Sequence, residues 1–284
     1  MFFLFMQFFC LFFIGQKLTS LYFSSLSLFN FCNLTIFRPD CFIFCNLRYI
    51  IKQFGMRKKL VISTGAGMSA ESGISTFRDS GGLWEQYPVM DVASAEGFER
   101  NPALVHNFYN ARRHDLMKAQ PNAGHKGLVK LEEWFDTYII TQNVDDLHER
   151  AGSKHVLHLH GELMKVRAID NDTQIYELES DSLDTTPDTI INGHHVRPHI
   201  VFFQEAVPCF EPATKLVSQA DIFVIIGTSL NVYPAAGLLH YVRPGVPVFY
   251  IDPNPASVPP GVTVLKTGAG KGVEELTKIL VALK

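Results

Sequence analysis

The segment 59–84 constrains the fold of this chain more than any other part of the sequence. It opens with an apolar run, Leu60-Val61-Ile62, which is typical of a buried parallel strand. Gly65 and Gly67 follow, and they let the backbone turn sharply and approach a ligand without a Cβ in the way. Small residues continue into an expected helix at about 67–73, whose first N–H groups would favour a phosphate. Such turns are common, so this one alone indicates a dinucleotide site only weakly.

Apolar strands and amphipathic helices alternate along most of the remaining chain. Strands are predicted at 60–63, 138–140, 156–157, 199–203, 221–226, 246–251 and 262–265. Helices are predicted at 102–118, 125–135 and 273–283. This alternation predicts an α/β fold, a Rossmann-like doubly wound parallel sheet that binds ligands beyond the carboxyl ends of its strands. An acidic, Thr-rich stretch at 164–196 predicts a small insert domain, which leaves 56–163 and 197–284 as the large domain.

Residues 1–55 differ in composition from everything that follows them. They hold 14 of the 23 Phe and four of the five Cys, against one acidic residue, Asp40. The apolar run at 1–14 is shorter than the roughly 18 residues that a spanning helix needs, and it lacks the basic start of a secretory signal. The composition favours a non-native upstream extension before a true start at Met56. A membrane-associated leader is the competing interpretation.

Charge and cysteine content exclude several classes of protein. The net charge of −3 over 284 residues gives nucleic-acid binding no electrostatic support. Cys209 is the one cysteine after Met56, so structural disulfides within that part are excluded. For 56–284 we expect a cytoplasmic location, no membrane contact and a monomeric state.

Three further motifs accompany the glycine segment, and each follows a predicted strand. They are Thr141-Gln142-Asn143-Val144-Asp145, His158-Leu159-His160-Gly161-Glu162 and Ile226-Gly227-Thr228-Ser229. In this order the four motifs resemble those of the sirtuins, the NAD-dependent protein lysine deacylases. The resemblance runs from about Lys59 to the C-terminus. It implies NAD as the cofactor and acyl-lysine proteins as the partners.

The resemblance also implies roles for individual residues. His160 would deprotonate a ribose hydroxyl of NAD, although a lone histidine is more often structural. Asn143 and Asp145 would complete the catalytic set by holding the nicotinamide ribose and carboxamide, although both residue types are also common turn formers. Further NAD contacts are implied for Gly65, Ala66, Gly67, Ser69, Glu71, Phe77, Arg78, Trp84, Gln142, Gly227, Thr228, Ser229, Asp252, Asn254 and Ala269. A carboxylate at Asp252 would disfavour a 2′-phosphate, which favours NAD over NADP.

Tyr109 and Arg112 share one face of the helix predicted at 102–118, because they are three positions apart. The pair could be the cationic edge of an amphipathic helix. It also resembles the Tyr-x-x-Arg signature of the desuccinylase type of sirtuin, which implies binding of a succinyl or malonyl carboxylate. Phe203 and Val232 are further implied substrate contacts. We therefore expect removal of succinyl and malonyl groups, with acetyl as an additional candidate.

Two positions depart from the family pattern. Most sirtuins hold a structural zinc with two cysteine pairs, but 164–196 contains no cysteine. We therefore expect no metal, and an insert held by its own strands and apolar contacts. Gln204 stands where the family usually has glycine, which adds a side chain beside the acyl-lysine tunnel and affects substrate affinity.

The implied reaction begins with loss of nicotinamide and gives free lysine and O-acyl-ADP-ribose. A protein ADP-ribosyltransferase would use the same NAD site and base, so it remains an alternative. A noncatalytic NAD-binding module is a second alternative. A hydride-transferring dehydrogenase is disfavoured because the glycine motif is not G-x-G-x-x-G.

Overall fold

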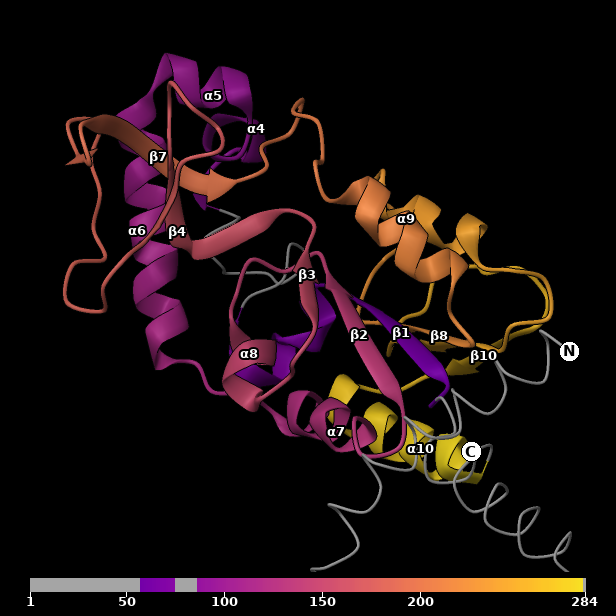
Figure 1. The fold of residues 1–284 in the computed structure, drawn as a ribbon. Helices are drawn as coiled ribbons and strands as arrows, with labels where there is room; N and C mark the ends of the chain where they lie inside the picture. The colour runs from indigo at the N-terminus through magenta and orange to yellow at the C-terminus, as the bar shows by residue number, and fades with distance from the viewer. Residues whose placement is uncertain (1–56, 75–85, 283–284) are drawn as a thin grey trace, which may run out of the picture. The chain divides into compact units, whose positions relative to one another are not determined.

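The structure is a computed structural model that describes residues 57–74 and 86–282 (Figure 1). The chain divides into two units, Met1–Gly55 and Met56–Lys284, and every described residue belongs to the second. The interpretation of residues 1–55 and the contacts predicted for Phe77, Arg78 and Trp84 therefore lie outside the described residues. In the described parts of the chain, no helix combines the length and apolar character that crossing a membrane requires.

A six-stranded parallel sheet confirms the predicted Rossmann-like core, with the strand order β10-β9-β8-β1-β2-β3. Its strands are β1 (Lys59–Thr64), β2 (Asp136–Thr141), β3 (Val156–His158), β8 (Ile222–Ile226), β9 (Val248–Ile251) and β10 (Val262–Leu265). β1 lies between β2 and β8, so that Thr64 is level with Thr141 on one side and Ile226 on the other. The strand order reverses at β1, and a ligand crevice is expected at the carboxyl ends of the strands beside this reversal.

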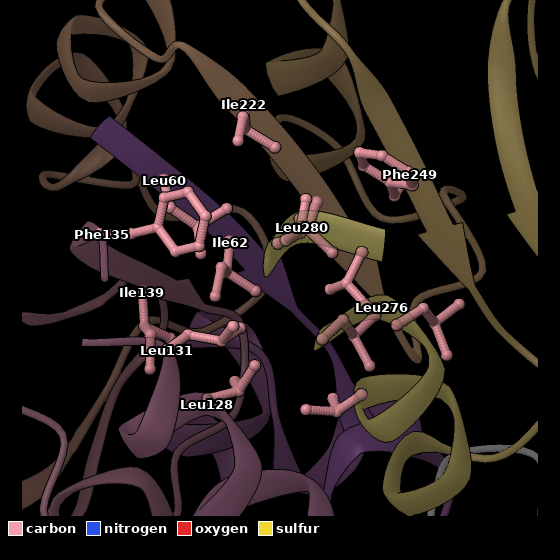
Figure 2. Close-up of a cluster of buried hydrophobic side chains, with 14 of the residues drawn as sticks. Leu60, Ile62, Leu128, Leu131, Phe135, Ile139, Ile222, Phe249, Leu276 and Leu280 are labelled. Atoms are coloured by element: carbon pink, nitrogen blue, oxygen red, sulfur yellow. The ribbon is translucent and has the colours of Figure 1, made fainter. Parts of the chain in front are cut away.

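Helices cover both faces of this sheet, which makes the fold doubly wound (Figure 1). On one face, Leu128 of α7 (Ala123–Leu131) and Leu276 of α10 (Ala269–Ala282) belong to the same buried cluster as Leu60 and Ile62 of β1 (Figure 2). The other face packs against α9 (Phe210–Ser218) and η4 (Ala235–Tyr241). Both faces of β1 are therefore buried, as its continuous apolar run predicts.

A second, antiparallel sheet has the strand order β5-β4-β7-β6. It contains β4 (Gly161–Ala168), β5 (Ile175–Glu177), β6 (Ile190–Ile191) and β7 (His194–Ile200). Helices α4 (Val89–Val92), α5 (Ala95–Arg100) and α6 (Pro102–Lys118) precede it in the chain. Phe108 of α6 packs in one buried cluster with Leu163 of β4 and Ile200 of β7. The layer around the second sheet is thus built from two separate stretches of chain, and the domain boundaries proposed above stay predictions.

Two of the predicted elements are wrong. Two single 3₁₀ turns, η2 (Ala66–Met68) and η3 (Ala70–Ser72), replace the helix predicted at 67–73. The N–H groups of Gly65 and Gly67 are bonded to the chain at 226–227, and this tie competes with a continuous helix. The run at 199–203 does not return to the main sheet, because β7 pairs with β4 and Phe203 forms a bridge with Ser94. An apolar run predicts a strand but does not say which sheet it joins.

Polar contacts from α6 also attach the insert, in addition to the strands and apolar contacts that the sequence predicts. The ring Nδ1 of His106 is 2.8 Å from Thr185 Oγ1, and Asn110 Nδ2 donates to the Thr185 carbonyl. The buried guanidinium of Arg113 donates to the carbonyl of Leu163 on β4. His106, Asn110 and Arg113 follow the spacing of one helix face, which leaves Tyr109 and Arg112 on a neighbouring face.

Thr185→Val should destabilise the fold by about 1–2 kcal/mol, because it leaves the buried His106 nitrogen without its hydroxyl partner. Urea denaturation would measure the change. The matched control is Thr186→Val at the exposed neighbouring position, where a change within about 0.5 kcal/mol is expected. Equal effects of the two substitutions would contradict a specific role for the Thr185 contact.

Candidate active site

Two glycine turns meet at the carboxyl ends of β1 and β8. The Gly67 N–H donates to the Gly227 carbonyl over 2.8 Å. A Cβ on Gly67 would lie 2.7 Å from the Gly227 Cα, and Gly227 itself has a φ of 62°. Glycine is needed at both positions because the two backbones touch. This contact brings the cofactor residues predicted at 65–67 next to those predicted at 227–229.

Ser69, Asn143 and Asp145 form a buried hydrogen-bonded cluster. Asn143 Nδ2 donates to Ser69 Oγ at 3.0 Å, and Ser69 Oγ donates to Asp145 Oδ2 at 2.9 Å. The second Asp145 oxygen accepts the N–H of Leu147, the first residue of α8 (Leu147–Ala151). Burial raises the pKa of Asp145, and its hydrogen bonds oppose that rise. The cluster fixes an amide and a carboxylate where the loops after β1 and β2 meet.

Gln142 links the loop after β2 to the loop after β8. Its Nε2 lies 3.2 Å from Thr228 Oγ1. Tyr250 of β9, which the sequence analysis did not single out, donates its hydroxyl to the Thr228 carbonyl at 2.7 Å. The signal was a tyrosine inside an otherwise apolar strand, because a buried Tyr hydroxyl needs a partner. Thr228 is thus held by the neighbouring strand β9 and by the loop after β2, which lies two strands away on the other side.

Asp252 and Asn254 extend the row of loops to the end of β9. Asp252 is 7% exposed, and its Oδ1 accepts the Asn254 N–H at 2.8 Å. The Gly227 N–H donates to the Ile251 carbonyl, so this turn lies beside the loop after β8. Most of the described residues predicted to bind the cofactor therefore lie along four adjacent strand ends, those of β2, β1, β8 and β9.

Glu71 and Ala269 lie together at the start of α10. Glu71 Oε1 accepts the N–H of Gly270 at 3.1 Å, and a Cβ on Gly268 would lie 2.4 Å from that oxygen. A carboxylate at a helix N-terminus stabilises the helix through its dipole and its unbonded N–H groups. Glu71 therefore attaches η3 to α10, a role the sequence analysis did not identify, and its predicted cofactor contact stays a prediction.

His160 directly precedes β4 and has a defined tautomer. Its Nδ1 lies 3.1 Å from the Gln142 carbonyl, which can only accept, so Nδ1 carries a proton. Burial lowers the pKa of His160, and the Gln142 carbonyl partly opposes this. The ring is therefore neutral at pH 7, and Nε2 is its basic nitrogen. This is the state that a general base requires.

Tyr109 and Arg112 lie on α6, close enough to Asp145 for its charge to act on Arg112. The Arg112 guanidinium carbon is 5.5 Å from the centre of the Tyr109 ring and 5.7 Å from that of Phe108. Tyr109 is 1% exposed, and burial raises its pKa to about 12. Burial lowers the pKa of Arg112, whereas the charges of Tyr109 and Asp145 raise it. Arg112 is thus electrostatically coupled to the predicted catalytic carboxylate.

Phe203 and Val232, the other predicted substrate residues, lie in the chain after β7 and in the loop after β8. The Val201 N–H donates to the His160 carbonyl at 3.0 Å, which places the chain leading to Phe203 beside His160. Phe203 is 43% exposed. Val232 is half-buried in the loop between β8 and η4. Neither side chain has a partner that assigns its role, so both stay predictions.

An ion-pair cluster holds the chain around Phe203 to the second sheet. Glu205 lies 2.8 Å from Arg197 of β7 and 3.2 Å from Arg167 of β4, and it also accepts the Phe202 N–H. Burial raises the pKa of Glu205, but these contacts together lower it below its ordinary value. Among the residues that the structure describes, no group of three or more His, Cys, Asp or Glu could hold a metal ion. The expected absence of zinc stays a prediction.

Gln204→Gly should stabilise the protein by about 0.5–1 kcal/mol, because Gln204 has a φ of 80°, a conformation that costs an L-residue more than glycine. Thermal or urea denaturation would measure the gain. Gln219→Gly is the matched control, since Gln219 has a φ of −100° at the end of α9 and should lose stability. A loss of stability in both variants would contradict strain at Gln204.

Comparison with known proteins agrees with this geometry. The model of the Sir2 family matches residues 65–234. An NAD-dependent protein deacylase of Bacteroides thetaiotaomicron is 57% identical over 230 residues, which cover 79% of this chain and 98% of that protein. An NAD-dependent protein deacylase of Helicobacter pylori is 46% identical over 228 residues, covering 80% and 99%. A solved Sir2 homologue in complex with NAD is 35% identical with a TM-score of 0.71, covering 83% and 94%. The chain belongs to the Sir2 family.

Proposed function

We propose that this sirtuin removes acidic acyl groups, succinyl and malonyl, from protein lysines in an NAD-dependent reaction. Deacylation follows from family membership and from relatives named NAD-dependent protein deacylases. The acidic preference rests on one observation, the placement of Arg112 against Tyr109 and in the field of Asp145. A guanidinium is suited to a planar, bidentate contact with a carboxylate, and an acetyl group offers no such carboxylate.

The residues at the strand ends fit NAD. Amide and carboxylate side chains at Asn143 and Asp145 suit a carboxamide and ribose hydroxyls, and their cluster with Ser69 already fixes them. The Asp252 carboxylate would bind the adenine ribose, and the two touching glycine turns would lie along the diphosphate. When bound, NAD supplies the ribose carbon that takes up the acyl oxygen and releases nicotinamide.

The chain's own residues would then orient the reactants and move one proton. His160 Nε2 would accept a proton from a ribose hydroxyl, because Nδ1 is engaged by the Gln142 carbonyl. Tyr109 and Arg112 would hold the distal carboxylate of the acyl group, which fixes the acyl carbonyl near the same ribose. The products are free lysine, nicotinamide and O-acyl-ADP-ribose.

The acyl-lysine peptide would bind as an added extended strand between 201–205 and 227–233. Main-chain hydrogen bonds give such binding affinity with little side-chain specificity. A Sir2 protein solved with a deacetylated p53 peptide has a TM-score of 0.66 to this chain at 30% identity. ADP-ribosyl transfer to protein would use the same NAD site, but the pair at Tyr109 and Arg112 favours an acyl-lysine. A monomeric state and a cytoplasmic location stay predictions.

The test is to incubate the full chain with NAD and matched succinyl-lysine, malonyl-lysine and acetyl-lysine peptides. Mass spectrometry would follow free lysine and O-acyl-ADP-ribose. We expect kcat/KM for succinyl to exceed that for acetyl by about tenfold or more, the value of one charge-assisted hydrogen bond. Removal of acetyl alone would identify a plain deacetylase. NAD binding without reaction of any peptide would favour the transferase or the binding module.

A further inference from the structure

Two histidines of one segment bind two consecutive carbonyl groups of the loop after β2. His160 Nδ1 lies 3.1 Å from the Gln142 carbonyl oxygen, and His158 Nδ1 lies 3.0 Å from the Asn143 carbonyl oxygen. The rings differ at their other nitrogen, because His158 Nε2 is 2.9 Å from Glu149 Oε1 on α8. A carbonyl and a carboxylate both accept, so both nitrogens of His158 donate. That is the hydrogen-bonding pattern of an imidazolium cation.

We propose that His158 is a positioning residue, an imidazolium that fixes the loop 142–145 in the geometry that NAD requires. This inference rests on the proposed function, since the loop carries Asn143 and Asp145. The ring joins the backbone of Asn143 to Glu149 on α8, the helix whose first N–H group binds Asp145. The His158 side chain is 8% exposed, whereas Glu149 is 41% exposed, so water competes less for the bond to the Asn143 carbonyl than for the bond to Glu149. His158 would act through the loop and not by touching the cofactor.

The charges around His158 support the cationic form. Burial alone would lower the pKa of His158, but the hydrogen bond and charge of Glu149, together with Glu162 of β4, raise it above its ordinary value. Burial lowers the pKa of His148 on α8, and the His158 charge lowers it further, so His148 is neutral.

The charge of His158 also reaches the predicted catalytic carboxylate. Burial raises the pKa of Asp145, and His158 is among the groups that lower it. Lys165 of β4, paired with Glu162 at 2.8 Å, helps to lower the pKa of Glu149. Charges therefore alternate from Arg112 through Asp145 and His158 to Glu149, so that opposite charges next to one another oppose the effect of burial on the pKa values.

The two histidines would respond to pH in opposite directions. The pKa of His158 is raised in the folded protein, so its link between the Asn143 carbonyl and Glu149 is complete below the ordinary histidine pKa. As pH rises through the raised value, the neutral ring keeps one N–H and can donate to only one of these two partners, so the link is lost. The pKa of His160 is lowered, so its basic nitrogen is available once the pH exceeds that lowered value. Activity should therefore fall at acid pH through His160 and at alkaline pH through His158.

The experiment compares His158→Gln and Glu149→Gln with the wild-type full chain. His155→Gln is the matched control, because His155 is exposed on the same segment and its ring stacks on Tyr138. NMR of the imidazole nitrogens in the cofactor-free protein would give the titration of His158 directly. Calorimetry from pH 6 to 10 would give NAD affinity, and rates would be followed on whichever acyl-lysine peptide the wild type removes.

We expect His158→Gln to weaken NAD binding about tenfold or more at neutral pH. It should also abolish the decline of NAD affinity that the wild type shows at alkaline pH. Glu149→Gln should move both the titration of His158 and the alkaline decline of NAD affinity to lower pH. His155→Gln should change neither. An alkaline decline that persists unchanged in His158→Gln would overturn the proposal. If His158→Gln does not fold, Glu149→Gln decides alone, and an unshifted decline overturns it. A wild type whose NAD affinity behaves as expected but which removes no acyl group would refute the proposed function and leave this inference standing.

Discussion

His160→Ala is expected to lower the rate of acyl transfer by about 10²–10⁴-fold, the usual contribution of a general base. The half-buried ring of His160 is neutral, and the Gln142 carbonyl fixes its Nδ1 proton, so Nε2 is the atom whose loss matters. NAD affinity, measured by calorimetry, should stay within about threefold, because the substitution leaves Asn143, Asp145 and Ser69 in their cluster.

Added imidazole should restore part of the lost rate in His160→Ala, since a small base can occupy the space that the ring leaves. His155→Ala, on the exposed part of the same segment, is the control and should retain wild-type rates. A His160→Ala variant with normal turnover would remove His160 from the mechanism. Loss of NAD binding in parallel with turnover would mean that the residue is structural.

Arg112→Met is expected to lower kcat/KM for a succinyl-lysine peptide by about 100-fold and to change that for an acetyl-lysine peptide by less than about threefold. Methionine keeps the apolar contact with Phe108 and Tyr109 but removes the only part of the side chain that can pair with a carboxylate. Steady-state kinetics on the two peptides, at saturating NAD, would measure the ratio.

One further variant distinguishes the charge of Arg112 from its geometry, and a second serves as the control. Arg112→Lys keeps the charge but loses the planar fork, so an intermediate loss of about tenfold is expected for succinyl. Arg100→Met is the matched control, because Arg100 pairs with Asp91 on the exposed surface and lies outside the predicted site. Equal losses for the succinyl and acetyl peptides in Arg112→Met would show that Arg112 stabilises the fold and does not select the acyl group.

The sequence predicted the parallel sheet and the loops that approach one another because both depend on local patterns. Buried parallel strands such as β1 are continuous apolar runs, and their carboxyl ends share one edge of the sheet. Motifs that follow such runs are therefore brought close together whatever their separation along the chain. The cluster of Ser69, Asn143 and Asp145 and the bond from Gln142 to Thr228 are results of this rule.

The features that the sequence analysis missed depend on contacts between distant elements. A local pattern does not reveal that Arg113 of α6 would bond a carbonyl of β4, or that Glu71 would bond the start of α10. The sequence alone assigns no role to His158, because only its partners, the Asn143 carbonyl and Glu149, distinguish it from an ordinary strand histidine. The predicted helix at 67–73 failed for the same reason, since a neighbouring loop holds that segment.

The bond between Glu71 and Gly270 has a consequence for how the protein is made. The two residues are 199 positions apart, and Gly270 lies in the first turn of α10, the last element that the structure describes. During synthesis, the first glycine turn leaves the ribosome long before the helix that anchors it. A growing chain would therefore carry all of its predicted catalytic side chains while one support of the segment after β1 is still missing. The hydrogen bond that Glu71 accepts could therefore form only after the start of α10 has been synthesised.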